Sequence, residues 1–174
     1  PDVADEDEVM AVMEKAVTLA AENLDNMRVA EGEKLAQDLL MRGQMIRDIV
    51  SKIEERAPMV VKDYTDKMYA RIKELLEDGV DIPEERFLVE AAVFADKSNI
   101  TEELVRLDSH MKQLADILTK SKEPVGKKLD FLVQEMNREA NTIGSKSNDI
   151  TITGHMLDIK SEIEKIREQV QNIE

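Results

Sequence analysis

The sequence predicts an all-α fold in which long amphipathic helices form an extended helical bundle. Aromatic residues make up only 3% of the 174 residues, and the 6 glycines and 4 prolines leave little for strands and tight turns. Charged residues make up 36% of the chain, and apolar residues recur at steps of three and four along much of it. We further expect a projecting N-terminal helix that is used in oligomerisation.

The first predicted helix covers residues 5–55. Its apolar residues at three- and four-residue steps are Val9, Met13, Ala16, Ala20, Leu24, Met27, Leu35, Leu39, Ile46, Ile49 and Ile53. An unbroken helix of ~50 residues is ~75 Å long, about twice the diameter of a compact domain of this size. Such a helix projects, and its apolar stripe needs a partner. The alternative is a pair of helices broken at Gly32, and Gly43 is a second candidate for a break.

Helix-start and helix-stop signals divide the rest of the chain. The pair Ala57-Pro58 ends the first helix, because proline favours the first turn of a new one. Pro83 followed by two glutamates starts another helix, and Asn99 is a candidate cap for the next. The further helices are expected at residues 58–77, 83–97, 99–120, 127–143 and 151–174, with a connector at 78–83.

Composition excludes several classes of protein. The net charge of -14 is unlike that of a basic protein that coats nucleic acid. The absence of cysteine removes disulfides, thiolate nucleophiles and cysteine-ligated zinc, and favours a cytoplasmic location. No apolar run approaches the ~20 residues that span a bilayer, so we expect no contact with membranes. Residues 1–8 are expected to be the remnant of an acidic linker, and residues 9–174 a single all-helical domain.

The helix predicted at 127–143 has an apolar stripe and two polar edges. The stripe, which we expect in the core, consists of Leu129, Leu132, Val133, Met136, Ala140 and Ile143. One edge carries Asp130, Gln134, Asn137 and Asn141, and the other carries Glu135 and Glu139 one turn apart. Amide side chains both donate and accept hydrogen bonds, which suits them to polar ligands. An ordinary polar contact with another helix is the alternative interpretation.

The helix predicted at 99–120 places Glu103, Arg106 and His110 on one edge. A carboxylate, a guanidinium and an imidazole together can handle a metal or a proton and stabilise an anion, as phosphodiester cleavage requires. The alternative is that these residues form surface salt bridges. The second histidine, His155, is expected to pack or to point to solvent.

A local excess of positive charge lies within this acidic chain. Residues 120–146 contain six bases and four acids, which makes this segment +2. A polyanion is expected to bind there in a salt-dependent way. Phe131 is the one aromatic residue nearby, so we expect recognition to depend on backbone and shape more than on base stacking.

Four segments resemble the C-terminal domain of the YicC/YloC endoribonucleases. They are residues 103–110 (ELVRLDSH), 126–146 (GKKLDFLVQEMNREANTIGSK), 166–174 (IREQVQNIE) and the Arg-x-x-Glu-Gly element at 28–32. The resemblance implies a cytoplasmic, hexameric, metal-dependent endoribonuclease that uses manganese or another divalent cation and acts on RNA. It also implies an N-terminal domain that this chain lacks.

Together these observations predict a site where the helices at 99–120 and 127–143 meet. The predicted catalytic residues are Glu103, His110, Glu135 and Glu139, and three of them, His110, Glu135 and Glu139, are also the predicted metal ligands. The predicted RNA-binding residues are Arg106, Lys127, Lys128, Arg138, Asn141 and Lys146, with Asp130 and Asn137 as additional candidates. Two other functions remain open: a helical module for oligomerisation and RNA docking without chemistry of its own, and a purely structural coiled oligomer.

Overall fold

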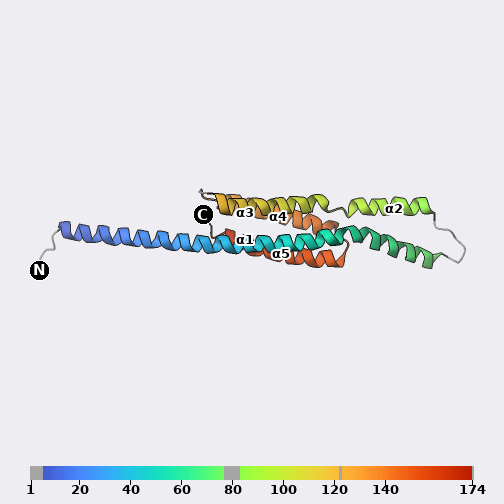
Figure 1. The fold of residues 1–174 in the computed structure, drawn as a ribbon, viewed down its shortest axis with the longest axis horizontal. Helices are drawn as coiled ribbons and strands as arrows, with labels where there is room; N and C mark the ends of the chain where they lie inside the picture. Colours follow the sequence, from blue (N-terminus) through green and yellow to red (C-terminus); the bar gives the residue numbers. More distant parts are fainter. Residues whose placement is uncertain (1–5, 77–82, 122, 174) are drawn as a thin grey trace. The chain divides into compact units, whose positions relative to one another are not determined.

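The computed structural model describes residues 6–76, 83–121 and 123–173, which form five helices and no strand. These are α1 (Glu6–Leu75), α2 (Glu84–Lys97), α3 (Thr101–Lys120), α4 (Gly126–Lys146) and α5 (Ile150–Val170) (Figure 1). The all-α prediction is therefore confirmed. Most of the connector predicted at 78–83 lies outside the described residues. None of the described helices is long and apolar enough to cross a membrane.

Two compact units divide the chain, and the boundary follows Asp38. In the first unit, residues 6–34 are helical and every one of them is exposed. Its large apolar side chains are 43–69% exposed: Val9, Met10, Val12, Met13, Val17, Leu19, Leu24, Met27 and Val29. The predicted apolar stripe is thus open to solvent in this unit, and its use in oligomerisation stays a prediction.

The long first helix that the sequence predicted is confirmed, and the alternative of a break at Gly32 or Gly43 is wrong. Helix α1 continues through Gly32 and Gly43, and it also continues through Pro58, where the sequence predicted a boundary. Proline removes the donor that would bond the Glu54 carbonyl four residues earlier. Pro58 is exposed and borders a surface hollow together with Glu54, where water can reach this part of the backbone. The buried side chains of Ile53 and Val60 hold the helix in the core on both sides of the proline.

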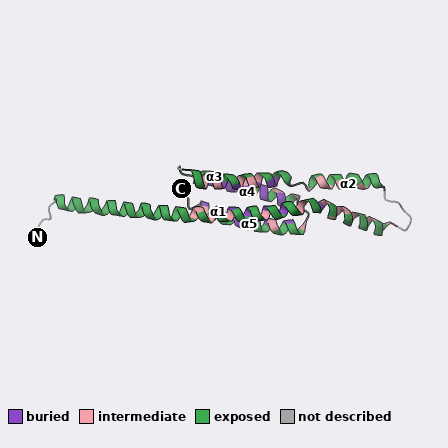
Figure 2. Ribbon diagram, in the orientation of Figure 1, coloured by how far each residue is buried: buried purple, intermediate pink, exposed green. Residues whose placement is uncertain are grey.

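The core belongs to the second unit, where α4 packs against both α3 and α5. All six residues of the stripe predicted on α4 are buried, which confirms that part of the prediction. The second part of α1 contributes Leu39, Ile46, Val50 and Ile53 to the same core. Figure 2 shows the buried residues gathered where these four helices lie side by side. Burial of this apolar surface is the main force that holds the four helices together.

Gly43 lies in the contact between α1 and α3. A Cβ atom at this position would lie 3.6 Å from Leu114 Cδ2 and 4.0 Å from Met111 Sδ, which is ordinary van der Waals contact. The glycine is buried inside a continuous helix and is not the break that its helix propensity suggested.

Aromatic pairs attach α2 to the last part of α1. The rings of Tyr64 and Phe94 are stacked with centroids 3.6 Å apart, and those of Tyr69 and Phe87 meet edge to face at 5.7 Å. Helix α2 has no buried residue of its own. The two ring pairs therefore join α2 to α1, and Phe94 also packs against the core.

Asp149 joins the start of α5 to α1. Its Oδ1 accepts hydrogen bonds from the backbone N–H groups of Thr151 and Ile152, at 3.1 and 3.0 Å, and so caps the helix. Its Oδ2 lies 2.7 Å from Nη2 of Arg56, which also contacts Asp63. The hydrogen bond from Arg56, followed by the backbone bonds, holds the pKa of Asp149 below its usual value.

We predict that replacing Asp149 by Asn destabilises the protein less at low pH than at pH 7. Asparagine preserves the cap but not the ion pair. Because the pKa of Asp149 is lower in the folded chain than in the unfolded chain, its ionic contribution is complete above the unfolded pKa, about 3.9, and is lost as the pH falls through the folded pKa. Urea unfolding of both proteins at pH 7 and pH 3 measures this. Equal destabilisation at both pH values would contradict it.

A histidine and two glutamates between α3 and α4

Helices α3 and α4 run antiparallel, and their facing edges pair residue by residue. Glu103 near the start of α3 bonds Lys146 at the end of α4, and Arg106 pairs with Glu139 one turn further along. His110 then faces Glu135 after another turn. These residues are three and four apart on α3 and four and seven apart on α4, so they fall on one edge of each helix. We call this line of polar residues the α3–α4 seam.

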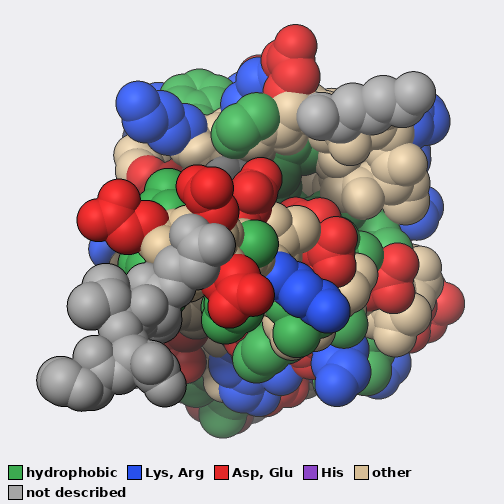
Figure 3. All heavy atoms as spheres, turned by 90° about the vertical axis from the view of Figure 1, so that its left-hand side faces the viewer, with side chains coloured by type: hydrophobic (Ala, Val, Ile, Leu, Met, Phe, Trp, Pro, Cys, Tyr) green, Lys and Arg blue, Asp and Glu red, His purple; other side chains and the backbone are tan. Residues whose placement is uncertain are grey.

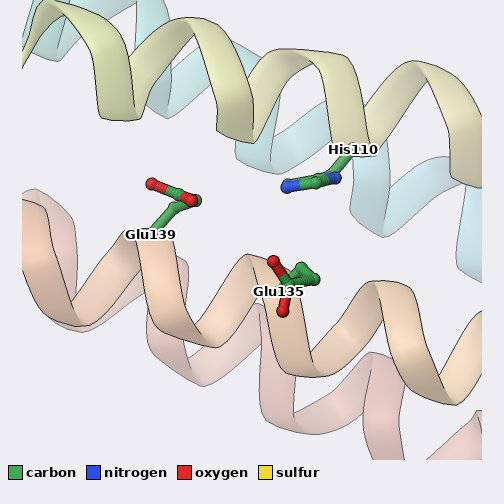
Figure 4. Close-up of side chains that lie close together, drawn as sticks. All are labelled: His110, Glu135 and Glu139. Carbon is green, nitrogen blue, oxygen red and sulfur yellow. The ribbon is translucent and has the colours of Figure 1, made fainter.

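The centre of the seam brings together a possible metal-binding group. One ligand atom each from His110, Glu135 and Glu139 lies within 4.8 Å of the others. Figure 4 shows His110 extending from α3 and the two glutamates extending from α4 into the space between the helices. Glu139 is buried, and the other two are half-buried. The structure therefore places three residues together that the sequence predicted as metal ligands, while their roles stay predictions.

The imidazole of His110 is the unusual member of this group. Both of its ring nitrogens are buried, and neither has a hydrogen-bond partner among the described residues. Leaving a buried polar atom without a partner costs about 1–3 kcal/mol, so such atoms in native proteins call for an explanation. A nitrogen donor beside two carboxylates is a donor set that divalent metals accept in proteins. The residues present thus fit a divalent cation.

Arg106 places a positive charge beside these carboxylates. Its Nε lies 3.0 Å from Oε1 of Glu139, and its other nitrogens lie 2.5 Å from Glu102 and 3.6 Å from Glu103. The contact with Glu139 is an ion pair without the direction of a good hydrogen bond. The side chain remains 43% exposed, so one part of the guanidinium is open to a ligand. Contact with Glu139, above all, raises the pKa of Arg106.

Glu103 lies beside the metal-binding group and not within it. Its side chain is only 4% exposed, and its Oε1 accepts a 2.7 Å hydrogen bond from Lys146, which also donates to the Asn99 carbonyl oxygen at 3.2 Å. Burial favours the protonated carboxyl, but the bond from Lys146, with a smaller contribution from Arg106, brings the pKa of Glu103 below its usual value. Glu103 therefore stays ionised and holds Lys146 and Arg106 in place.

The other predicted RNA-binding residues lie on the surface of α4. Lys127, Lys128, Arg138 and Asn141 are exposed, and Arg138 lies 3.7 Å from Glu135. Lys127 and Lys128 border a hollow between α3 and α4. The additional candidates Asp130 and Asn137 are half-buried on α4 outside the metal-binding group, as is His155 on α5.

Sequence reasoning missed two partners in the seam. Glu102 pairs with Arg106 four residues later, a spacing that signals a helical ion pair and was available in the sequence. The Asn99 carbonyl that receives Lys146 is 47 residues away from it in the chain, and no sequence pattern indicates this contact.

The seam carries three carboxylates, those of Glu103, Glu135 and Glu139, against the two cations Arg106 and Lys146. On the face of the molecule that Figure 3 draws, acidic side chains are mixed with basic and hydrophobic ones. An anionic ligand is therefore attracted by individual groups such as Arg106, and not by the overall field of a chain with net charge -14.

Comparisons with known proteins agree on one family. The family model described as "Endoribonuclease YicC-like, C-terminal" matches residues 53–174. The chain is 50% identical over 170 residues to a protein of Clostridioides difficile named "Probable endoribonuclease YicC", covering 98% of this chain and 58% of that protein. It is 36% identical over 148 residues to a protein of the same name in Haemophilus influenzae, covering 85% of this chain and 50% of that protein. The chain thus spans little more than half the length of these relatives.

We predict that replacing Lys146 by Met lowers the free energy of unfolding by about 1–3 kcal/mol, because it leaves the buried carboxylate of Glu103 without its main partner. The matched control is Lys120→Met, since Lys120 pairs with Asp116 and both side chains are more than 60% exposed. Loss of that surface pair costs less than about 0.5 kcal/mol. Equal unfolding midpoints for the two variants in urea would show that the Glu103 pair has no special importance.

Proposed function

Because this chain belongs to the YicC-like endoribonuclease family, we propose that it is the C-terminal domain of a metal-dependent endoribonuclease that hydrolyses RNA phosphodiester bonds. The observation that carries this proposal is the group formed by His110, Glu135 and Glu139, with its buried and unpartnered imidazole. The relatives' names support RNA as the substrate.

In this proposal, His110, Glu135 and Glu139 hold Mn²⁺ or another divalent cation. Carboxylates suit Mn²⁺ and Mg²⁺, and the imidazole favours a transition metal, so the mixed set fits Mn²⁺ better than Mg²⁺. When bound, the ion supplies Lewis-acid polarisation of the phosphate and lowers the pKa of water. Glu139 has a second task, because it also fixes the guanidinium of Arg106 next to this position.

Arg106 is the group that meets the phosphate. Two of its neighbours, Glu102 and Glu139, anchor it from opposite helices, and its exposed part can donate hydrogen bonds to the negative charge that develops on the phosphoryl oxygens. Glu103 acts through Arg106 and Lys146 as a positioning residue. Lys127, Lys128, Arg138 and Asn141 are exposed and hold the RNA backbone on either side.

We expect this chain to bind Mn²⁺, and we expect His110→Ala and Glu139→Gln to weaken that binding by at least about tenfold, because each removes one of three ligands. Electron paramagnetic resonance of free Mn²⁺ measures binding without reference to activity. The matched control is Glu164→Gln, an exposed glutamate on α5. If His110→Ala and Glu139→Gln both bound Mn²⁺ with wild-type affinity, the proposal that these residues hold the metal would be wrong.

We expect Mn²⁺ to support cleavage of labelled single-stranded RNA, and a chelator or Glu139→Gln to abolish it. The assay compares this chain with a longer protein that contains it, since the chain spans about half the length of its relatives. Undiminished cleavage by Glu139→Gln would exclude that residue from the mechanism. RNA binding without cleavage in both proteins, unaffected by chelator, would instead favour a docking module without chemistry of its own.

The exposed apolar side chains of α1 support a second component of the function, which is self-association. Residues 6–34 bury nothing within the described chain, although they carry nine large apolar side chains. Exposed apolar surface of this extent marks a contact site. We propose that a second copy of the chain covers it, within a homo-oligomer that the family resemblance suggests is a hexamer. Light scattering that gives the mass of a single chain at micromolar concentration would contradict this.

A further inference from the structure

We propose that the hollow next to the metal-binding group is a subsite for one unpaired nucleotide of the RNA, with its base stacked on Phe131 and its phosphate held by Lys127 and Lys128. The hollow has a volume of about 400 Å³ and lies between α3 and α4. Its lining consists of Gln113, Ile117, Lys127, Lys128, Phe131 and Leu132. This inference rests on the proposed function and adds how the substrate is held beside the cleaved bond.

The hollow continues the α3–α4 seam. On α3, Gln113 is one turn beyond His110, and on α4, Phe131 is one turn before Glu135. At 1.5 Å rise per residue, Phe131 and Lys128 lie about 6 and 10 Å along α4 from Glu135. A nucleotide adjacent to a phosphate at the metal-binding group therefore reaches the hollow without crossing another element.

Phe131 is the one aromatic ring of the chain that has no ring partner. The chain has five aromatic residues, and the other four form the two pairs that attach α2 to α1. The side chain of Phe131 is 60% exposed, in contrast to the buried Leu132 next to it. An exposed phenylalanine face next to two lysines is what base stacking uses in proteins that bind single-stranded nucleic acid.

Lys127 and Lys128 are available to an anion. Both are exposed and form no ion pair within the described residues, whereas Arg106 and Lys146 are engaged by glutamates. They stand in the first turn of α4, which contains no acidic residue and has no side-chain cap. The backbone N–H groups there add a partial positive charge. The amide of Gln113, which makes only a long 3.4 Å contact with Ser109, can meet the polar edge of a base.

A nucleotide fits this site better than a protein segment does. A protein partner that covered Phe131 would also remove two lysines from water, and it would need acids placed to compensate them. A single nucleotide brings an aromatic face and a negative charge together, in the same arrangement that the site offers. Its base must be unpaired, because a base within a duplex does not expose its face to a side chain.

The test measures binding in chelator, where no cleavage occurs, with two short labelled oligonucleotides: oligouridylate and an abasic oligomer of the same length. We expect Phe131→Ala to weaken binding of oligouridylate by about tenfold and to leave the abasic oligomer unchanged. We expect the double variant Lys127→Gln/Lys128→Gln to weaken binding of both oligomers and to reduce the salt dependence of that binding. The matched control is Leu157→Ala, which truncates an apolar side chain on α5 that is 65% exposed.

A direct readout comes from Phe131→Trp, because the chain contains no tryptophan. Stacking of a base on the single indole quenches its emission, so oligouridylate is expected to quench it and the abasic oligomer is not. Equal affinities of the wild type and Phe131→Ala for oligouridylate, or equal quenching by both oligomers, would overturn the subsite. The subsite would also be overturned if Phe131→Ala changed the oligomeric mass and left the affinity for RNA unchanged. That result would assign the ring to a contact between copies of the chain. None of these results depends on metal or cleavage, so failure of the subsite is distinct from failure of the nuclease proposal.

Discussion

The requirement that buried charges be paired governs the arrangement of α3 and α4. Glu103 and Glu139 are buried carboxylates on facing helices, and each has its cation on the opposite helix. Sliding one helix by a turn would leave both carboxylates buried without a partner, at a cost that exceeds what a typical surface contact contributes. The register that satisfies them is also the register that brings His110 opposite Glu135 and Glu139. The same register of α3 against α4 therefore produces both the buried ion pairs and the candidate site.

The helices that pack against the apolar faces of α3 and α4 stabilise this register. The apolar stripes of α3 and α4 share a core with α5 and the second part of α1, and Gly43 of α1 is buried in the contact with α3. Further ion pairs join α1 to α5 at each end of the core, through Arg42 with Glu162 and Arg56 with Asp149. A site held by side chains on packed helices keeps its geometry better than one on loops. The seam is thus built on packed helices, and among its described residues the imidazole of His110, Oε2 of Glu103 and Nε of Arg106 lack a hydrogen-bond partner.

An acidic chain can bind a polyanion when some of its cationic side chains are paired with carboxylates and others remain available to the ligand. Arg106 and Lys146 are held by carboxylates in the seam, whereas Lys127 and Lys128 at the start of α4 form no ion pair with any described residue. The net charge of -14 opposes loose association with nucleic acid, so the RNA binding proposed above would depend on local contacts along the seam. In the proposed function, this division makes binding of RNA at one place compatible with the acidic composition of the chain.

The sequence by itself determined the all-α class, the positions of most helices, the core stripe of α4 and the family, because these follow from local periodicity and long matched segments. It also indicated that the edges carrying His110, Glu135 and Glu139 belong together. Only the tertiary structure decided that α1 continues through Pro58, because burial of Ile53 and Val60 outweighs the lost hydrogen bond. The tertiary structure alone decided that Gly43 lies in the contact between α1 and α3, and that the Asn99 carbonyl accepts a hydrogen bond from Lys146. Both depend on segments that are distant in the chain. Helical periodicity defines which edge a residue occupies, but the partner of that edge is chosen by packing.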